Sequence, residues 1–264
     1  MDFTIITPNL NYGRFLADCL ESVASQTCVT LEHLVLDGGS TDDSAEVAAR
    51  FPHIRWASGK DSGMSGAINR GFNEAKGDWV IWLNADDKFK PGALATMLKI
   101  LRTTDADTVY GDYDFVDEDG TLLRHMRVPR WSAFVHIWHH CYIPSTAAFY
   151  RRSSVIGEGH RLREDFRYVM DGEFYARLHS LGKTFLHVPV NVADFRMHGG
   201  NASQRHLEKY DMDSIVAAEL QHVESRAIRR AYGFAGFKDP YLTGLVDGLL
   251  SITSRGWKAV LKLR

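Results

Sequence analysis

The stretch Trp79-Val80-Ile81-Trp82-Leu83-Asn84-Ala85-Asp86-Asp87 is a strongly apolar run that ends in two adjacent carboxylates. The run predicts a buried strand, and the polar residues after it predict the rim of a sheet, where open α/β folds place their ligands. Neighbouring carboxylates repel each other unless a cation or a shared proton relieves the charge, and their oxygens suit Mg²⁺ or Mn²⁺ bridging substrate phosphates. A surface turn or a helix N-cap is the alternative, because aspartate is common in both and Pro91 lies just downstream.

Strand-like and helix-like segments alternate around this stretch through the first hundred residues. We expect strands near 3–7, 31–36, 54–58 and 79–83, and helices near 13–26, 42–51, 63–75 and 91–103. This alternation is typical of βαβ units around a mainly parallel sheet.

The pattern changes from about residue 104, where strand-like segments follow one another. Residues 108–116 alternate like a strand, Glu118-Asp119-Gly120 indicates a hairpin turn, and residues 121–128 return. Further strands are expected near 145–150 and 183–192, with a helix over 171–180. The fold class predicted is therefore α/β with a mixed, mainly parallel central sheet flanked by helices.

Composition places the chain among ordinary globular proteins. It has 264 residues, 45% of them hydrophobic, and a net charge of −2, which gives no argument for a nucleic-acid partner. Three cysteines without a CxxC pair suggest neither a disulfide framework nor a zinc site. The start lacks the basic and apolar regions of a secretory signal, and no segment approaches the roughly 20 apolar residues that span a bilayer. A cytoplasmic location is expected.

The last sixty residues, 206–264, predict a helical C-terminal extension. Beyond Gln221 this extension has eight basic residues against three acidic ones, interleaved with apolar residues; the basic residues are Arg226, Arg229, Arg230, Lys238, Arg255, Lys258, Lys262 and Arg264. Such a segment suits the anionic inner face of the cytoplasmic membrane. A solvated helix that packs its apolar side on the main domain is the alternative.

A second acidic loop, Asp37-Gly38-Gly39-Ser40-Thr41-Asp42, follows the expected strand over 31–36 and opens a helix. An acid at this place can accept hydrogen bonds from a nucleobase or a ribose. Neither this loop nor Gly59-Lys60-Asp61-Ser62-Gly63 fits G-x-G-x-x-G or a P-loop. Hydride transfer and ATP hydrolysis therefore lose support.

Four motifs occur in an order that can be recognised. They are Thr7-Pro8-Asn9-Leu10-Asn11, Asp37-Gly38-Gly39-Ser40-Thr41-Asp42, Asp61-Ser62-Gly63 with Ala67-Ile68-Asn69-Arg70-Gly71, and Leu83-Asn84-Ala85-Asp86-Asp87. Over roughly residues 3 to 203 the chain resembles the family 2 inverting glycosyltransferases that use nucleotide sugars. The resemblance implies a GT-A (Rossmann-like) catalytic domain over 1–205, with a donor half at about 1–103 and an acceptor half at about 104–205.

The resemblance also implies a site for a nucleotide-diphosphate sugar and for Mn²⁺ or Mg²⁺. The residues that it assigns to the donor are Thr7, Asn11, Asp37, Asp61, Asn69 and Asp86, and those that it assigns to the metal are Asp87 and His198, the latter in Arg196-Met197-His198. Two departures stand out. Asn84 replaces the first acid of the family's DxD motif, and Gly38 replaces an acid often found after Asp37, which weakens the argument for uridine.

An inverting transfer needs a base that deprotonates the acceptor hydroxyl. In the family the base is an acid about six residues before an Arg-Leu pair on a late helix. Asp171 has this spacing from Arg177-Leu178. Glu173 is the second choice, Glu164 and Asp165 are loop alternatives, and a mere helix cap is the structural alternative for Asp171. Trp131, Trp138 and Tyr142 are expected to stack on an acceptor sugar or to fill the core.

The function implied is transfer of a sugar, from a UDP-sugar by preference, to a hydroxyl of a glycan or lipid-linked oligosaccharide in bacterial surface polysaccharide synthesis. A polyprenyl-phosphate sugar synthase uses the same fold with a phosphate acceptor, which needs no strong base. A catalytically silent module that binds a sugar nucleotide or a glycan is the third hypothesis.

Overall fold

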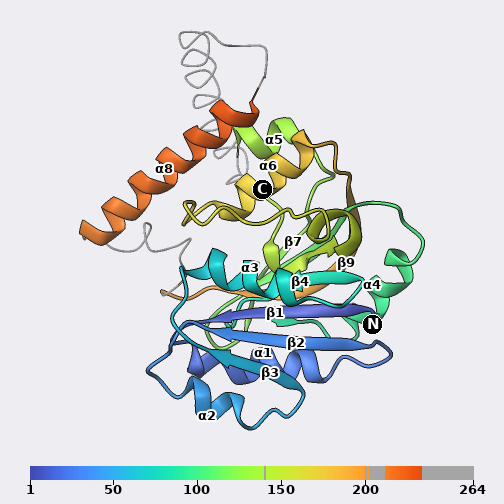
Figure 1. Ribbon diagram of the computed structural model, residues 1–264, viewed down its shortest axis with the longest axis vertical. Coiled ribbons are helices and arrows are strands. Elements are labelled where there is room, and N and C mark those ends of the chain that lie inside the picture. The colour runs from blue at the N-terminus through green and yellow to red at the C-terminus, as the bar shows by residue number, and fades with distance from the viewer. Residues whose placement is uncertain (140, 200, 202–211, 234–264) are drawn as a thin grey trace.

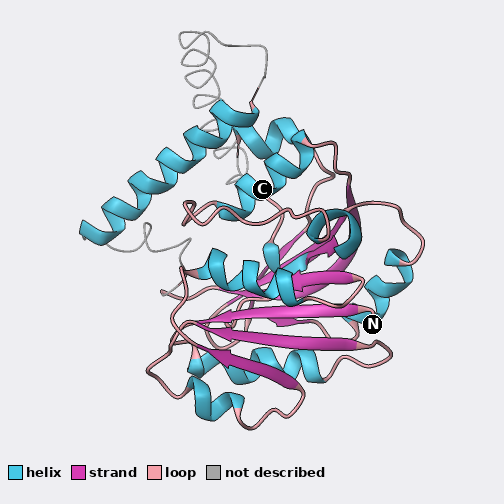
Figure 2. Ribbon diagram, in the orientation of Figure 1, coloured by secondary structure: helices cyan, strands magenta, loops and turns pink. Residues whose placement is uncertain are grey.

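One mixed sheet runs through the protein, with helices against both of its faces (Figures 1 and 2). The structure is a computed structural model that describes residues 1–139, 141–199, 201 and 212–233. Nine strands of the described chain form this sheet. In spatial order eight of them are β3 (Ile54–Ser58), β2 (Leu31–Asp37), β1 (Phe3–Asn9), β4 (Trp79–Trp82), β8 (Ala148–Arg151), β6 (Thr108–Val116), β9 (Phe185–Arg196) and β5 (Lys88–Phe89), while β7 (Leu122–Met126) pairs with β6.

The sheet is parallel over its first four strands and mixed beyond them. Strands β3, β2, β1 and β4 are parallel neighbours, whereas β8 is antiparallel to both β4 and β6. Strand β9 then runs parallel to β6, and β5 and β7 pair antiparallel with β9 and β6. The prediction of a mainly parallel mixed sheet with a β6–β7 hairpin is confirmed.

Helices connect and cover these strands. They are α1 (Gly13–Ala24), α2 (Ser44–Ala48), α3 (Met64–Glu74), α4 (Ala93–Leu101), α5 (Ala133–Trp138), α6 (Met170–Ser180) and α8 (Met212–Tyr232), with a 3₁₀ turn η1 (Ser145–Ala147) and a π-helical turn η2 (Arg152–Ile156). The four helices expected in the first hundred residues are present, each a few residues shorter than predicted. Among the described residues, no helix is both long and apolar enough to cross a membrane.

Strand β4 is apolar throughout because both of its faces are buried. Ile81 lies in a cluster with Phe3 and Ile5 of β1 and with side chains of α1 and α4. Trp82 lies in the opposite cluster, with Ile6 of β1 and with side chains of α3 and α6. A strand covered on both faces reads as a continuous hydrophobic run, which explains the stretch that predicted it.

Three elements differ from the sequence prediction. Strand β5 and helix α5 were not predicted, and the strand expected over 145–150 begins as η1 before continuing as β8. Of the expected extension, α8 is described, while 206–211 and the basic segment beyond Gly233 lie outside the described residues.

Candidate functional site

The carboxyl ends of β1 and β2 bring two polar side chains together at one edge of the sheet. Asn9 and Asp37 are register partners, and Asn9 Nδ2 donates to Asp37 Oδ1 over 2.8 Å. Parallel strands deliver their last residues to the same edge, where ligands of open α/β sheets bind. Asn9, which sequence reasoning had not assigned, therefore holds one of the predicted donor residues.

The Asp37 carboxylate is fixed by a set of short hydrogen bonds. Its oxygens accept from the hydroxyls of Ser40 (2.5 Å) and Ser58 (2.6 Å) and from the backbone N–H of Ser40 (3.0 Å). Burial alone would raise the pKa of Asp37, but the hydrogen bonds from Ser40, Ser58 and Asn9 outweigh it and lower that pKa. The group is therefore an ionised acceptor at neutral pH.

Asp61 and Asn11 lie on exposed loops beside this edge. A Cβ on Gly38 would lie 3.2 Å from Asp61 Oδ2, so the two motifs meet. Asn11 has a positive φ of 58°, and its Oδ1 accepts the N–H of Thr41 over 2.8 Å. The structure thus brings Asn11, Asp37 and Asp61 to one region, and it explains why Gly38 is tolerated there: an acid would stand against Asp61.

Two predicted donor residues are engaged inside the protein instead. Thr7 is fully buried, with Oγ1 2.9 Å from His33 Nε2. The amide of Asn69 accepts from Leu162 N over 2.8 Å and donates to Leu162 O over 2.9 Å. The hydrogen-bonding groups of Thr7 and Asn69 therefore hold the chain together in this structure, which differs from the expected contact with a nucleotide.

The acidic pair lies beyond the end of β4 and is almost completely buried. Asp87 is 1% exposed; its Oδ1 accepts Arg196 N over 3.0 Å and its Oδ2 accepts Asn84 Nδ2 over 3.1 Å. Burial raises the pKa of Asp87 well above its usual value, and the neighbouring Asp86 carboxylate raises it further. A bound cation would relieve this unfavourable charge.

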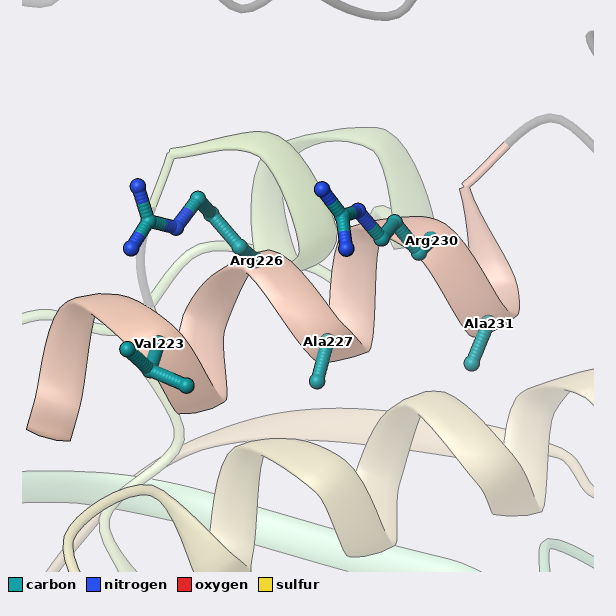
Figure 3. Close-up of a pocket in the computed structure, with 5 residues that line it drawn as sticks. All are labelled: Val223, Arg226, Ala227, Arg230 and Ala231. Carbon is teal, nitrogen blue, oxygen red and sulfur yellow. The ribbon is translucent and has the colours of Figure 1, made fainter. Parts of the chain in front are cut away.

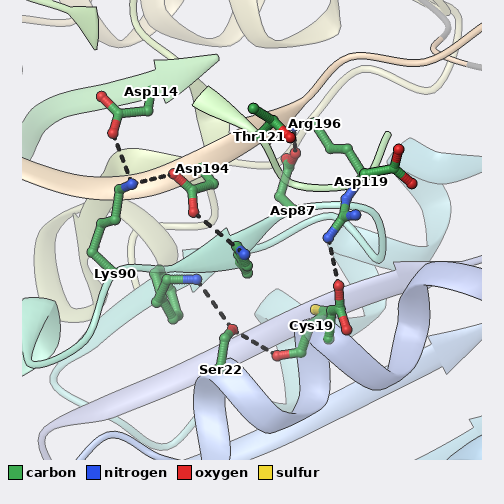
Figure 4. A network of polar contacts seen from close by, with 12 residues as sticks. Cys19, Ser22, Asp87, Lys90, Asp114, Asp119, Thr121, Asp194 and Arg196 are labelled. Atoms are coloured by element: carbon green, nitrogen blue, oxygen red, sulfur yellow. Dashed lines mark hydrogen bonds and ion pairs between the residues drawn. The ribbon is translucent and has the colours of Figure 1, made fainter. Parts of the chain in front are cut away.

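Lys90, the residue after β5, pairs with two buried carboxylates (Figure 4). The Lys90 ammonium lies 2.7 Å from Asp114 Oδ2 on β6 and is also paired with Asp194 on β9. The network fixes the segment after Asp87 to the far strands of the sheet, so the acidic pair is held at both ends.

The Arg196-Met197-His198 segment closes over the pair. His198 Nε2 lies 3.0 Å from Asp86 Oδ2, which also accepts Asn201 Nδ2 over 3.2 Å. The Arg196 guanidinium donates to Asp86 O over 3.0 Å and to Asp18 Oδ2 over 2.7 Å. His198 thus lies against the acidic pair, where its predicted role as a metal ligand stays a prediction, and the Arg196 guanidinium is bound to protein partners.

The donor set at this place suits a hard divalent cation. Asn84 Oδ1 is buried and has no hydrogen-bond partner among the described residues, while the Nδ2 of the same amide is bonded to Asp87 and His198 is bonded to Asp86. No group of three His, Cys, Asp or Glu side chains in the described chain is arranged to hold a metal alone. Mg²⁺ and Mn²⁺ sites recruit substrate phosphates to complete their shell, so the residues fit a metal that arrives with its nucleotide.

Asp171 lies in the first turn of α6. Its Oδ1 accepts the N–H of Gly172 over 2.8 Å, and the Cys141 thiol lies 3.7 Å from its Oδ2. Burial raises the pKa of Asp171, and these hydrogen bonds only partly oppose that effect. A carboxylate with a raised pKa is a stronger base, which is the property required of the residue that deprotonates an acceptor hydroxyl.

The alternatives to Asp171 are bound within the protein. Glu173 is fully buried between Arg177 Nε at 2.8 Å and the Tyr232 hydroxyl at 2.7 Å. Glu164 accepts from Ser62 over 2.6 Å. Asp165 is exposed and paired with Arg163, so Asp171 has the fewest strong partners of these acids.

The three aromatic residues that the sequence assigned either to an acceptor or to the core pack into the core. Trp138 and Tyr142 are buried in the cluster that includes α6, and Trp131 stacks on Phe185 with ring centroids 4.1 Å apart. Their irregular spacing had left both roles open, and the structure favours the core.

Comparison with known proteins gives the family. The sequence profile of glycosyl transferase family 2 matches residues 4–159. A PGL/p-HBAD biosynthesis glycosyltransferase of Mycobacterium bovis (strain BCG / Pasteur 1173P2) is 32% identical over 213 residues, covering 75% of this chain and 78% of that protein. An uncharacterized glycosyltransferase of Nostoc sp. is 26% identical over 253 residues, covering 88% and 78%.

Solved structures share the fold. S. aureus TarS 1-349 in complex with UDP-GlcNAc has a TM-score of 0.65 at 16% identity, over 85% of this chain and 66% of that one. The mannosyltransferase PcManGT from Pyrobaculum calidifontis, in complex with GDP-Man and Mn²⁺, has a TM-score of 0.61 at 17% identity, over 97% and 83%. These likenesses confirm the predicted GT-A fold, and the profile match and the mycobacterial relative show that this chain belongs to glycosyl transferase family 2.

Proposed function

We propose that this glycosyltransferase transfers a sugar with inversion from a nucleotide diphosphate, UDP by preference, to a hydroxyl of a glycan or lipid-linked oligosaccharide in bacterial surface polysaccharide synthesis. The observation that carries the inverting mechanism is Asp171, a partly buried carboxylate of raised pKa at the start of α6. The UDP-GlcNAc held by TarS and the GDP-Man held by the mannosyltransferase support the donor class.

The donor would bind along the carboxyl ends of β1, β2 and β4. Asp37 is held as an anion by Asn9, Ser40 and Ser58, and a hydroxyl of the ribose or an N–H of the base would take the place of one of these donors. Asp61 and Asn11 stand beside it on the exposed side of the same edge. The diphosphate and sugar would then reach the acidic pair after β4.

In the transfer step, the Asp171 carboxylate takes the proton of the acceptor hydroxyl. The hydroxyl oxygen forms a bond to the anomeric carbon while the bond from that carbon to the diphosphate oxygen breaks on the opposite face, which inverts the configuration. General-base catalysis of this kind contributes about 10²-fold to 10⁴-fold to the rate.

Asp87 and His198 would hold Mn²⁺ or Mg²⁺, which supplies Lewis-acid stabilisation of the charge on the leaving diphosphate. Hydrogen bonds from Arg196 N and Asn84 Nδ2 fix the Asp87 carboxylate, and the contact with Asp86 fixes His198, so the side chains that would bind the metal are held in place. The Mn²⁺ bound by the mannosyltransferase supports this assignment.

A thermal-shift screen of UDP, GDP, TDP and CDP with and without Mn²⁺ tests the donor site. Ligand at about a hundred times its dissociation constant stabilises the fold by about 2.7 kcal/mol. We expect one nucleotide to shift the melting temperature only with Mn²⁺, and Asp87→Ala to abolish that shift. Asp105→Ala, an exposed aspartate before β6 at the opposite edge of the sheet, is the control. No shift with any nucleotide would favour a silent module whose ligand is a glycan.

The described part of α8 supports contact with an anionic membrane surface. Arg226 and Arg230 are exposed one turn apart, and their guanidinium groups extend from one side of the helix (Figure 3). With Val223, Ala227 and Ala231 they line an open hollow of about 500 Å³. Clustered arginines beside small apolar side chains are typical of helices that bind phosphate headgroups.

A further inference from the structure

Helix α8 packs against α6, the helix that carries Asp171 (Figure 1). Ile228 is buried, and its Cδ1 lies 3.8 Å from the position that a Cβ on Gly172 would take. The Tyr232 hydroxyl donates to Glu173 Oε1 over 2.7 Å. Two contacts therefore fasten α8 to the two residues that follow Asp171.

A third contact reaches the residues that precede Asp171. Glu224 Oε1 accepts the backbone N–H of Arg167 over 2.7 Å, and Glu224 Oε2 accepts those of Tyr168 and Val169 over 2.9 and 3.0 Å. The first backbone N–H groups of a helix have no partner within the helix, and a side chain of the N-cap residue often accepts a hydrogen bond from one of them. Val169, at the N-cap of α6, has an apolar side chain that cannot do so.

Glu224 accepts the N–H of Val169, the N-cap residue of α6, and those of the two residues before it, so it fixes the loop that leads into the helix. The loop that it holds ends two residues before Asp171, whose own carboxylate is bonded to Gly172 N and lies near the Cys141 thiol. A small displacement of that loop would rotate the first turn of α6 and move the base. Misplacement of a reacting group by about 1 Å can cost about 10²-fold in rate.

We propose that Glu224 is a positioning residue for the transfer step: its carboxylate fixes the loop over 167–169 and so aims Asp171 at the acceptor hydroxyl. This inference rests on the proposed role of Asp171 as the base. It gives α8, which lies outside the part of the chain matched by the family profile, a part in the reaction.

The test is a double-mutant cycle on the full chain between Glu224→Ala and Asp171→Asn, read as kcat, KM and donor affinity. Glu224→Ala should lower kcat about 10-fold to 100-fold and leave the dissociation constant for the nucleotide within about twofold. In the Asp171→Asn background it should cause no further loss, because a residue that acts only through Asp171 has nothing left to position. Glu224→Gln keeps the length of the side chain and one acceptor oxygen. Its kcat should lie between those of the wild type and Glu224→Ala, and the variant should remain folded.

Tyr232→Phe is the matched control, because it removes another contact between α8 and α6 without touching the loop. It should lower the melting temperature slightly and leave kcat unchanged. Equal losses from Glu224→Ala in both backgrounds, or an unchanged kcat in Glu224→Ala and Glu224→Gln, would overturn the positioning role. An unchanged kcat in Asp171→Asn would overturn the proposed base and with it this inference. A loss of kcat in Asp171→Asn without any loss in the Glu224 variants would overturn only the role of Glu224.

Discussion

The raised pKa of Asp171 sets the pH dependence expected of the transfer. A base acts in its deprotonated form, so kcat should rise as pH rises through the pKa of Asp171 and stay level above it. Burial raises that pKa above the ordinary value of an aspartate side chain, and the acid limb should therefore lie at a higher pH than an ordinary aspartate would give. The measurement is kcat against pH at saturating donor.

Asp171→Asn should lower kcat about 10²-fold to 10⁴-fold and remove that acid limb. Asp165→Asn is the control, since this exposed neighbour is paired with Arg163. If Asp171→Asn kept its rate while donor binding persisted, a phosphate acceptor, which needs no strong base, would become the better hypothesis.

The effect of Asn84→Asp on stability should depend on whether the metal is bound. Its Nδ2 donates to Asp87 Oδ2 over 3.1 Å, and Asn84→Asp would replace this bond with two like charges in a buried place. Without metal the variant should lose about 1 to 3 kcal/mol of unfolding free energy. With Mn²⁺ and nucleotide it should recover more stability than the wild type gains, because a third carboxylate adds a hard ligand. Chemical denaturation under both conditions measures the two effects, and equal gains in both proteins would contradict a metal at this place.

The packing of α3 on β1 depends on a glycine. A Cβ on Gly71 would lie 2.6 Å from Ile6 Cγ2, a buried and branched side chain with little room to move. Gly71→Ala should therefore cost about 1 to 3 kcal/mol of unfolding free energy through overpacking. Gly59→Ala is the matched control, because a Cβ there would meet nothing within 4 Å. Urea denaturation of both variants checks this, and equal stabilities would show that the helix can shift without cost.

The elements that could be predicted are those whose sequence pattern is set by burial. β1, β2 and β4 were predicted because apolar side chains on both faces leave a continuous run of hydrophobic residues. β5 has two residues and α5 has six, which is too short for either periodicity to show. Trp131 and Tyr142 beside α5 pack into the core at irregular spacing, so their sequence could not distinguish packing from binding.

At the scale of the whole molecule, the residues at the sheet edge could be predicted from the sequence. The contacts of α8 that hold the loop before Asp171 could not. The order of the motifs placed Asp37 and the acidic pair after strands, and parallel pairing then brought those ends together. Glu224 gave no such signal, because it acts on backbone N–H groups 55 to 57 residues earlier, which any sequence could supply. Helix α8 is also a part of the chain that family motifs do not cover, so its role follows from three-dimensional contacts alone.

Helix α8 presents different chemistry on its two sides, and this predicts how the whole protein would meet a membrane. Ile228 and Tyr232 face α6, whereas Arg226 and Arg230 are exposed (Figure 3). Each arginine near an anionic surface contributes about 1 kcal/mol, so changing both to alanine should weaken binding to anionic vesicles about tenfold or more. Co-sedimentation of the full chain with phosphatidylserine and with neutral phosphatidylcholine vesicles, at low and high salt, measures this. Arg50→Ala with Arg102→Ala removes the same charge from exposed positions elsewhere and should leave binding unchanged. An equal loss of vesicle binding in both double variants would mean that the net charge of the protein, rather than this face of α8, determines its affinity for the lipid. Unchanged binding in the Arg226 and Arg230 double variant would mean that this face of α8 does not contact the lipid.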